Sequence, residues 1–232
     1  MKGRLVVTTP WPAMARTVWG DASLAASSGW VGDLETYRQR YWSTFCDADG
    51  EPVMALDLAD LARPWEDGSI SVLGHSREEL RLGADGVVVA AAELEGTMLA
   101  SSSELIDVVV VALPDPVKHI RADKVQITIP VACLVLPEGT ELTEEMTNEF
   151  KRATFEAHGE NCVPIDFVRI PAIPRTHNSK PMRNVLQRLF LSDSGALSDV
   201  SEIANPTCLL ELKAAIDEWC FDQARPMLDQ RC

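Results

Sequence analysis

A histidine and a cysteine four residues apart form one arrangement in this sequence that could do chemistry. They are His158 and Cys162, in the segment HGENC. A thiol beside an imidazole can act as a nucleophile activated by a base. Because the sequence shows no third group to orient the base, a structural or surface role for both residues is favoured. His75 and His119 likewise have no partner that the sequence identifies.

The common signatures of nucleotide, hydrolase and metal chemistry are absent. The chain contains no GxxxxGK[ST], GxGxxG, GxSxG or HExxH segment. Its six cysteines include no CxxC pair, which argues against a zinc site or a disulfide framework. We therefore expect no metal site, and free thiols in a reducing compartment.

Composition narrows the class of protein. The chain has 232 residues, of which 46% are hydrophobic and 24% charged, as is typical of a globular protein with a buried core. The net charge of -14 would repel nucleic-acid phosphates. The longest apolar stretches, 86–94 and 108–113, are shorter than the roughly 18 to 20 residues of a membrane span. With no signal-peptide pattern in MKGRLVVTTP, we expect a cytoplasmic protein that neither binds nucleic acid nor spans a membrane.

Hydrophobic periodicity predicts the elements that would position any site. Residues 1–73 show short strand-like runs between Gly, Asp and Pro turns, at 5–8, 53–56 and 69–73, with a short helix near 36–44. The pattern changes at Gly74. Beyond it, the sequence predicts strands over 106–113, 125–136 and 166–170, and helices over 91–100, 142–153, 181–191 and from 205 onward. Thr143 is the expected N-cap of the second of these helices.

The segment IPAIPRTHNSKPMRNVLQRLF, residues 170–190, resembles the C-terminal lysine motif of the AMP-forming acyl-CoA synthetases, P-K-T-x-S-G-K-x-x-R. The residues that carry the likeness are Pro174, Arg175, Thr176, Ser179, Lys180 and Arg183. The serine-glycine pair that precedes the lysine in the family reads Asn178-Ser179 here, which favours a stiffer loop.

Other segments follow in the family's order. ADLARPWEDGSISVLGHS, residues 59–76, resembles T-G-D-L-A-R-x-x-E-D-G-Y-x-x-x-x-G-R, and AAAELE, residues 90–95, matches the helix start G-x-A-E-I-E. TPWPAMARTVWGD with YWSTF, and SDVSEIANPTCLLELKAAI near the end, resemble segments of the acetyl-CoA and acetoacetyl-CoA synthetases. The resemblance thus covers nearly the whole chain.

The resemblance implies roles for two residues above all. Lys180 stands at the position of the family's lysine, which bridges the substrate carboxylate and the α-phosphate of ATP. Asp60 stands at the position of the aspartate that binds the nucleotide ribose, with Ala59 where the family has glycine.

The resemblance also covers the ribose-contacting pair, the hinge and the CoA side, where some positions depart from the family pattern. His75 replaces the arginine of the ribose-contacting Gly-Arg pair, and Arg77 replaces the hinge aspartate. Arg81 stands near the hinge lysine or asparagine. Gly86 begins the segment Gly-x-Arg-Ile on the CoA side, in which Val88 replaces the arginine.

The resemblance implies an α+β protein with four regions. These are a β-rich remnant of the large adenylation domain at 1–73, a hinge at 74–81, a small lid domain with a central sheet flanked by helices at 82–191, and a helical tail at 192–232. The family's phosphate loop and acyl pocket precede the matched segment, so we expect the chain to be inactive alone.

Three functional hypotheses remain open from the sequence. The first is the C-terminal portion of a short-chain acid–CoA ligase of the acetyl-, propionyl- or acetoacetyl-CoA type, with ATP/AMP and CoA as substrates and Mg²⁺ implied. Its partner would be a large adenylation domain or a full-length ligase. The second is a non-catalytic paralogue that binds or regulates such a ligase, favoured by His75, Arg77 and Val88. The third is a fragment without a selected role.

Overall fold

The chain divides into two compact units between Glu78 and Glu79. The computed structural model describes residues 2–15, 18–19, 32–51, 53–115, 126–192 and 201–229. The division falls inside the segment 74–81 that the sequence analysis assigned to a hinge. His119 lies outside the described residues.

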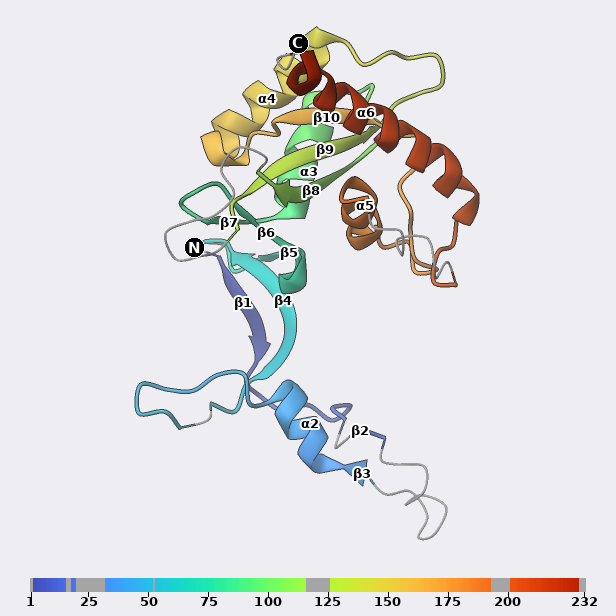
Figure 1. The fold of residues 1–232 in the computed structure, drawn as a ribbon. Helices are drawn as coiled ribbons and strands as arrows, with labels where there is room; N and C mark the ends of the chain where they lie inside the picture. Colours follow the sequence, from blue (N-terminus) through green and yellow to red (C-terminus); the bar gives the residue numbers. More distant parts are fainter. Residues whose placement is uncertain are drawn as a thin grey trace. The chain divides into compact units, whose positions relative to one another are not determined.

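The N-terminal unit is built on an antiparallel sheet with the order β1-β4-β5 (Figure 1). A short β2-β3 pair precedes a helix, α2, whose buried Tyr37 donates its hydroxyl to the Ala15 carbonyl at 2.8 Å. The elements are β1 (Gly3–Val7), β2 (Val18–Trp19), β3 (Gly32–Asp33), α2 (Leu34–Tyr41), β4 (Leu56–Pro64) and β5 (Ile70–His75), followed by a 3₁₀ turn (Ser76–Glu78).

The strand expected at 53–56 is wrong, because β4 begins at Leu56 and continues to Pro64. A β-bulge interrupts the pairing of β4 with β1. The register of β1 against β4 shifts between Leu5 and Val6, and Ala59 has a φ of 63°, in the left-handed region. Between these two pairs β1 advances by one residue and β4 by three, from Asp57 to Asp60, so two residues of β4 stand outside the regular pairing.

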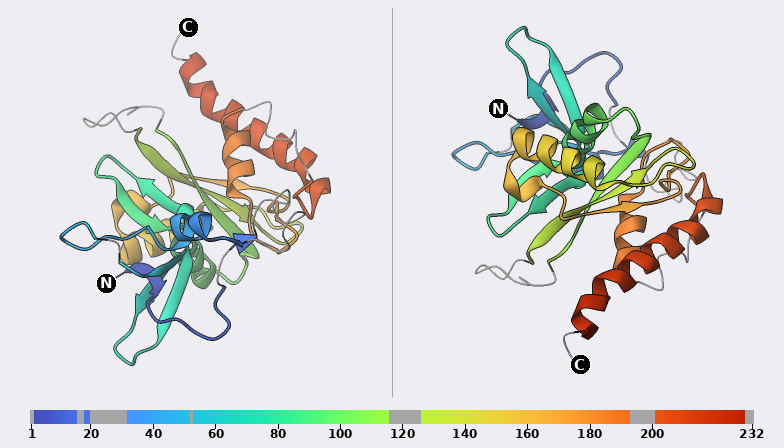
Figure 2. Two further views of the ribbon diagram at one scale, coloured as in Figure 1. Left: turned by 90° about the horizontal axis from the view of Figure 1, so that it is seen from below. Right: turned by 90° about the horizontal axis from the view of Figure 1, so that it is seen from above.

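The C-terminal unit is a mixed sheet with helices on both faces (Figures 1 and 2). Strand β9 lies between β8, which is antiparallel to it, and β10, which is parallel. The elements are β6 (Glu79–Leu82), β7 (Val87–Ala90), α3 (Ala91–Ser101), β8 (Asp107–Pro114), β9 (Thr128–Val135), α4 (Glu144–His158), β10 (Asp166–Arg169), α5 (Arg183–Phe190) and α6 (Leu209–Asp229). The predicted α+β class is confirmed, whereas the β6-β7 hairpin was not foreseen.

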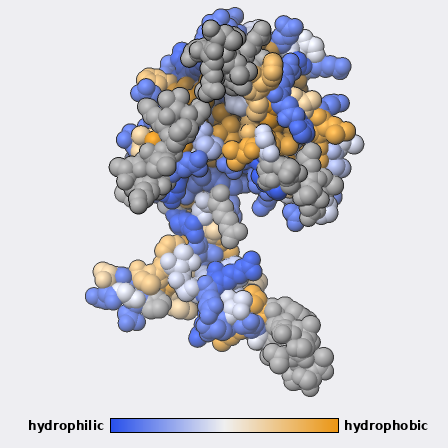
Figure 3. Space-filling model, viewed as in Figure 1, coloured by the Kyte–Doolittle hydropathy of each residue, from blue (hydrophilic) through white to orange (hydrophobic). Residues whose placement is uncertain are grey.

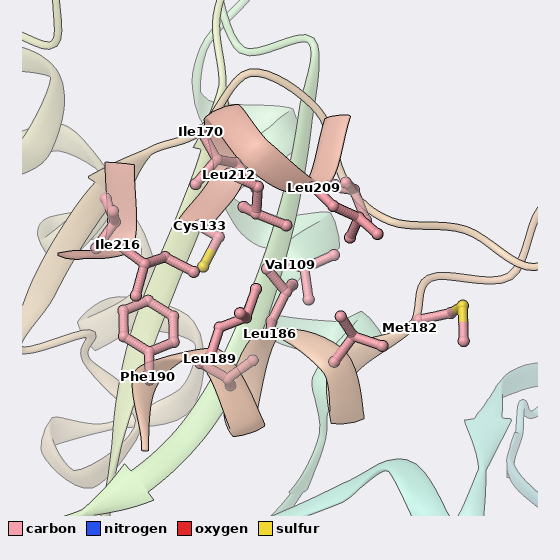
Figure 4. Packing of buried hydrophobic residues seen from close by; sticks show 14 of the residues in the cluster. Val109, Cys133, Ile170, Met182, Leu186, Leu189, Phe190, Leu209, Leu212 and Ile216 are labelled. Atoms are coloured by element: carbon pink, nitrogen blue, oxygen red, sulfur yellow. The ribbon is translucent and has the colours of Figure 1, made fainter. Parts of the chain in front are cut away.

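The valine run of the sequence forms β8, and it is buried throughout because helices cover both faces of this strand. Val109 and Val111 face the core formed with α5 and α6, part of which is shown in Figure 4. Val108 and Val110 face the opposite core, formed with α3 and α4. Burying one such side chain stabilises the fold by about 1.5–3 kcal/mol, so both layers of helices are held through this sheet.

Helix α4 has the N-cap that the sequence predicts. The Thr143 hydroxyl accepts the Met146 N–H at 3.2 Å, which confirms the predicted N-cap of α4.

Helix α6 buries Leu209, Leu212 and Ile216 in the same core as α5 (Figure 4). Trp219 of α6 also donates its indole N–H to Asp166 Oδ2 of β10 at 2.7 Å. Among the described helices, none has the length and apolar content needed to cross a membrane.

The cysteines of the described residues are free thiols, namely Cys46, Cys133, Cys162, Cys208 and Cys220. Cys133 lies in the sheet core with no exposed surface. Burial, and secondarily the charge of Glu95, raise the pKa of the Cys133 thiol far above its usual value, so it remains protonated.

A buried ion pair joins the two helical layers at the outer edge of β8. Glu95 of α3 accepts hydrogen bonds from Arg183 of α5, at 2.8 and 2.6 Å from Nη2 and 3.2 Å from Nε. Glu95 Oε1 also accepts the Val110 N–H at 2.9 Å. One carboxylate thus holds α3, β8 and α5 together.

Replacing this carboxylate tests that assignment. In Glu95→Gln the Arg183 guanidinium loses its counter-charge while it stays buried, so we expect a loss of about 3 kcal/mol in the free energy of unfolding. Urea denaturation followed by circular dichroism measures it. The matched control is Glu156→Gln, which removes an exposed partner of Arg152 on α4 and should cost less than about 1 kcal/mol. Equal losses in the two variants would contradict the assignment.

Candidate functional site

Asp60 and His75 lie opposite each other on neighbouring strands of the N-terminal unit. They are direct register partners in the antiparallel pair β4-β5. Directly opposed residues of such a pair present their side chains on the same face of the sheet. Both residues are half-buried. The structure therefore brings together the two positions for which the resemblance implies ribose contacts.

A buried aspartate fixes the backbone just before Asp60. Asp57 Oδ1 accepts the Ala59 N–H at 2.8 Å, and Asp57 Oδ2 accepts Arg4 Nη2 of β1 at 2.6 Å. Burial works to raise the pKa of Asp57, but the hydrogen bonds from Arg4 and Ala59, with the Arg4 charge, outweigh burial and lower it. The ionised carboxylate thus anchors the bulge from which Asp60 extends.

Lys180 lies in a closed loop between β10 and α5. An isolated bridge pairs Arg175 with Pro181, and the Thr176 N–H donates to the Lys180 carbonyl at 2.9 Å. A turn closes inside this bridge, with the Ser179 N–H donating to the Thr176 carbonyl at 2.8 Å. Ser179 has a φ of 61°, in the left-handed region where the family's motif has glycine. Lys180 is exposed at the end of this turn.

The segment before α6 is hydrogen-bonded to the loop that carries Lys180, which we call the lysine loop (residues 173–181). Asn205 Oδ1 accepts the Arg175 N–H at 2.9 Å, and Asn205 Nδ2 donates to the Ile173 carbonyl at 2.9 Å. The Ala204 N–H donates to the Arg175 carbonyl at 2.8 Å. The loop is therefore fixed to a segment about 30 residues further along the chain.

Arg81, Gly86 and Val88 belong to the β6-β7 hairpin. Arg81 and Val88 are register partners, and both are exposed. Gly86 has a φ of 63°, and its N–H donates to the Gly83 carbonyl at 3.2 Å, which closes the turn. Arg77 lies in the 3₁₀ turn that precedes β6, and its side chain is outside the described part.

His158 makes a polar contact in the structure, and Cys162 is buried. One ring nitrogen of His158 lies 2.8 Å from the Thr97 hydroxyl. Cys162 is only 1% exposed and belongs to the core between α4 and the sheet. In these positions both side chains contribute to the packing and polar contacts of the C-terminal unit.

The sequence reading missed two acidic partners of the lysine motif. Arg183 pairs with Glu95, and Arg175 pairs with Asp107 at 2.5 Å. Each pair joins residues far apart in the chain, so neither could be read from local spacing. In the part of the chain that the structure describes, no cluster of three His, Cys, Asp or Glu residues could hold a metal ion.

Two solved structures contain a fold similar to that of this chain. An acetoacetyl-CoA synthetase from Streptomyces lividans aligns with a TM-score of 0.62 over 96% of this chain and 29% of its own, at 18% identity. The anthranilate CoA ligase AuaEII, in complex with anthranoyl-AMP, aligns with a TM-score of 0.56 over 85% of this chain and 31% of its own, at 17% identity. The fold is that of the adenylate-forming ligases.

Sequence comparison gives the closer relationship. No family model matches the chain. An acetyl-coenzyme A synthetase from Pyrobaculum arsenaticum is 29% identical over 226 residues, which are 97% of this chain and 29% of the relative. One from Photobacterium profundum is 27% identical over 92% of this chain and 28% of its own length. The chain is related to the C-terminal part of the AMP-forming acyl-CoA synthetases, and spans less than a third of the length of these relatives.

Glycine at position 59 should stabilise the N-terminal sheet. Left-handed backbone costs an alanine about 1–2 kcal/mol of stability. Glycine avoids this cost, but its more flexible unfolded chain lowers stability by about 0.4–1 kcal/mol. We therefore expect Ala59→Gly to raise the opening free energy of β4 by about 0.5–1 kcal/mol, measured by native-state hydrogen exchange. The control is Ala62→Gly, a buried position of β4 without left-handed backbone, which should lower it. Loss of protection in both variants would refute the strain at Ala59.

The Asp57 anchor should make the N-terminal unit sensitive to acid. Because the folded-state pKa of Asp57 lies below its ordinary value of 3.8, its stabilisation is complete above that value and is lost as pH falls further. We expect the N-terminal unit of Asp57→Asn to be less stable at pH 7. We also expect its stability to fall less than that of the wild type as the pH is lowered below about 3.8. Hydrogen exchange of β4 amides from pH 7 to pH 3 measures both effects, with Glu66→Gln in the exposed β4-β5 turn as the control. A decline of unchanged size in Asp57→Asn would exclude the anchor.

Proposed function

We propose that the chain supplies the lysine-bearing C-terminal part of a short-chain acid–CoA ligase. The observation that carries this proposal is the position of Lys180. It is exposed on a closed loop whose sequence resembles the lysine motif of the AMP-forming synthetases. The proposal is supported further by the similarity to acetyl-coenzyme A synthetases over 97% of the chain.

The lysine would act in the first half of the reaction. A carboxylate oxygen attacks the α-phosphorus of ATP, and the bond from this phosphorus to the β,γ-phosphates breaks. Pyrophosphate departs, and the product is an acyl-adenylate. Both reacting groups are anionic, so their approach is favoured by a cation placed between them. A compact ammonium on a flexible stem suits this task. In the second half, the thiol of CoA attacks the acyl carbon and AMP leaves.

The Asp60–His75 pair would hold the nucleotide. A carboxylate accepts hydrogen bonds from the ribose hydroxyls, and an imidazole beside it can donate or accept one more. ATP, AMP and CoA enter as substrates. Mg²⁺ would enter with the ATP phosphates, as it commonly does in nucleotide-dependent enzymes.

The rest of the site would come from a large adenylation domain. The chain corresponds to about 29% of the length of its acetyl-coenzyme A synthetase relatives. The phosphate loop and the acyl pocket of the family belong to the remaining part. We therefore propose that Lys180 acts on substrates that such a domain or a full-length ligase binds.

A second candidate function is a non-catalytic module that binds or regulates such a ligase. Val88 favours it, because this exposed side chain stands where the family has an arginine on the CoA side. His75 likewise replaces a permanently charged arginine. Under this alternative, binding to a ligase would persist without Lys180.

Loss of the Lys180 ammonium tests the first candidate. The measurement is ATP–pyrophosphate exchange with acetate, using the full chain mixed with the large domain of an acetyl-coenzyme A synthetase. We expect Lys180→Ala to lower the rate by about 10²–10³-fold, because it removes a charge from the reacting centre. The control is Lys213→Ala, an exposed lysine of α6, which should leave the rate unchanged.

The outcomes separate the two candidates. Exchange that depends on the added chain and on Lys180 supports the ligase. Exchange that is unaffected by Lys180→Ala contradicts it. Stable binding to the large domain with no gain of exchange favours the regulatory module.

A further inference from the structure

A single guanidinium connects the lysine loop to the central sheet. Arg175 Nη1 donates to the Ser179 carbonyl at 2.6 Å, and Arg175 Nη2 donates to Asp107 Oδ2 at 2.5 Å. Ser179 immediately precedes Lys180, so the carbonyl that Arg175 binds belongs to the peptide group that enters Lys180. The contact therefore acts on the backbone from which the lysine side chain starts.

The other side of this peptide group is also held. The Lys180 N–H donates to the Thr176 hydroxyl at 3.2 Å. With the carbonyl bound by Arg175 and the N–H bound by Thr176, the plane of the Ser179–Lys180 peptide is fixed from both sides. That plane sets the direction in which the Lys180 side chain leaves the loop.

The loop needs such support because Ser179 is strained. Its φ of 61° lies in the left-handed region, where a side chain with a Cβ atom is disfavoured. Strained backbone persists only where the surrounding structure over-determines it. The Arg175 contact is one of the interactions that hold Ser179 there.

Asp107 anchors the guanidinium to a rigid element. It is the first residue of β8, and its Oδ1 accepts the Val108 N–H at 2.9 Å. This bond orients the carboxylate so that Oδ2 faces Arg175. A continuous path therefore runs from the sheet through Asp107 and Arg175 to the Lys180 backbone.

We propose that Arg175 is a positioning residue for Lys180, with Asp107 as its anchor. The proposal rests on the proposed function for what Lys180 does. The side chains of Arg175 and Asp107 are 34% and 31% exposed, so as an ion pair they contribute little to overall stability. Arg175 and Asp107 instead stabilise the local conformation of the lysine loop.

Two variants test the clamp in the full chain. Arg175→Lys keeps the charge, but an ammonium cannot hold both acceptors in the forked geometry of a guanidinium. Asp107→Asn keeps the shape of the anchor and removes its charge. In both, we expect the amides of Thr176, Ser179 and Lys180 to exchange about tenfold faster with deuterium, while Tm falls by less than about 4 °C. Arg152→Lys, which alters an exposed ion pair on α4, is the control.

The second readout is kinetic. In ATP–pyrophosphate exchange with an added large domain, we expect both variants to lower kcat by up to about 10²-fold, because a misplaced group loses its near-attack geometry. The KM for ATP should change by less than about twofold, since ground-state binding is unaltered. A structural defect would lower Tm and move both constants.

The outcomes distinguish this proposal from the proposed function. Unchanged amide exchange in Arg175→Lys and Asp107→Asn overturns the clamp, whatever the activity. Faster loop exchange with unchanged kcat overturns a role in positioning for the reaction. Faster loop exchange in a chain whose wild-type form supports no adenylation retains the clamp and rejects the proposed ligase function.

Discussion

The C-terminal unit depends on the buried contact between Glu95 and Arg183. A carboxylate in this environment must be fully paired, because an uncompensated buried charge is strongly destabilising. Glu95 meets this requirement with donors from α5 and from the Val110 backbone. The contact closes the outer edge of β8 and joins the helices of both faces. Because α5 begins at Arg183, the same contact fixes where the lysine loop ends.

The sequence predicted the elements whose apolar pattern is regular, and failed where the backbone departs from regular geometry. The valine run of β8, the capped helix α4 and the apolar face of α6 each follow a simple period. Strand β4 does not, because the bulge at Ala59 interrupts its alternation. The β6-β7 hairpin was missed because Val87–Ala90 continues directly into the apolar start of α3. A continuous apolar run gives no signal of where a strand ends and a helix begins.

The residues of the candidate site come from sequence motifs, whereas the side chains that support them carry no local sequence signal. Lys180, and Asp60 with His75, follow from motifs, and the strand register then places the latter two opposite each other. Asp107 carries no local signal, because it lies 68 residues from Arg175 and becomes its partner only once β8 and the loop are packed together. Long-range polar partners of this kind depend on the tertiary fold.

The departures from the family pattern are of two physical kinds. Ala59 and Ser179 stand where the resembled motifs have glycine, and both adopt left-handed backbone at a cost in strain. His75 and Val88 replace arginine, and neither side chain can supply a permanent planar cation. Left-handed backbone therefore occurs directly before Asp60 and Lys180, whereas the arginine charges of the resembled motifs are missing at positions 75 and 88. Under the proposed function, these losses weaken substrate recognition and leave intact the loop that places a positive charge between two anions.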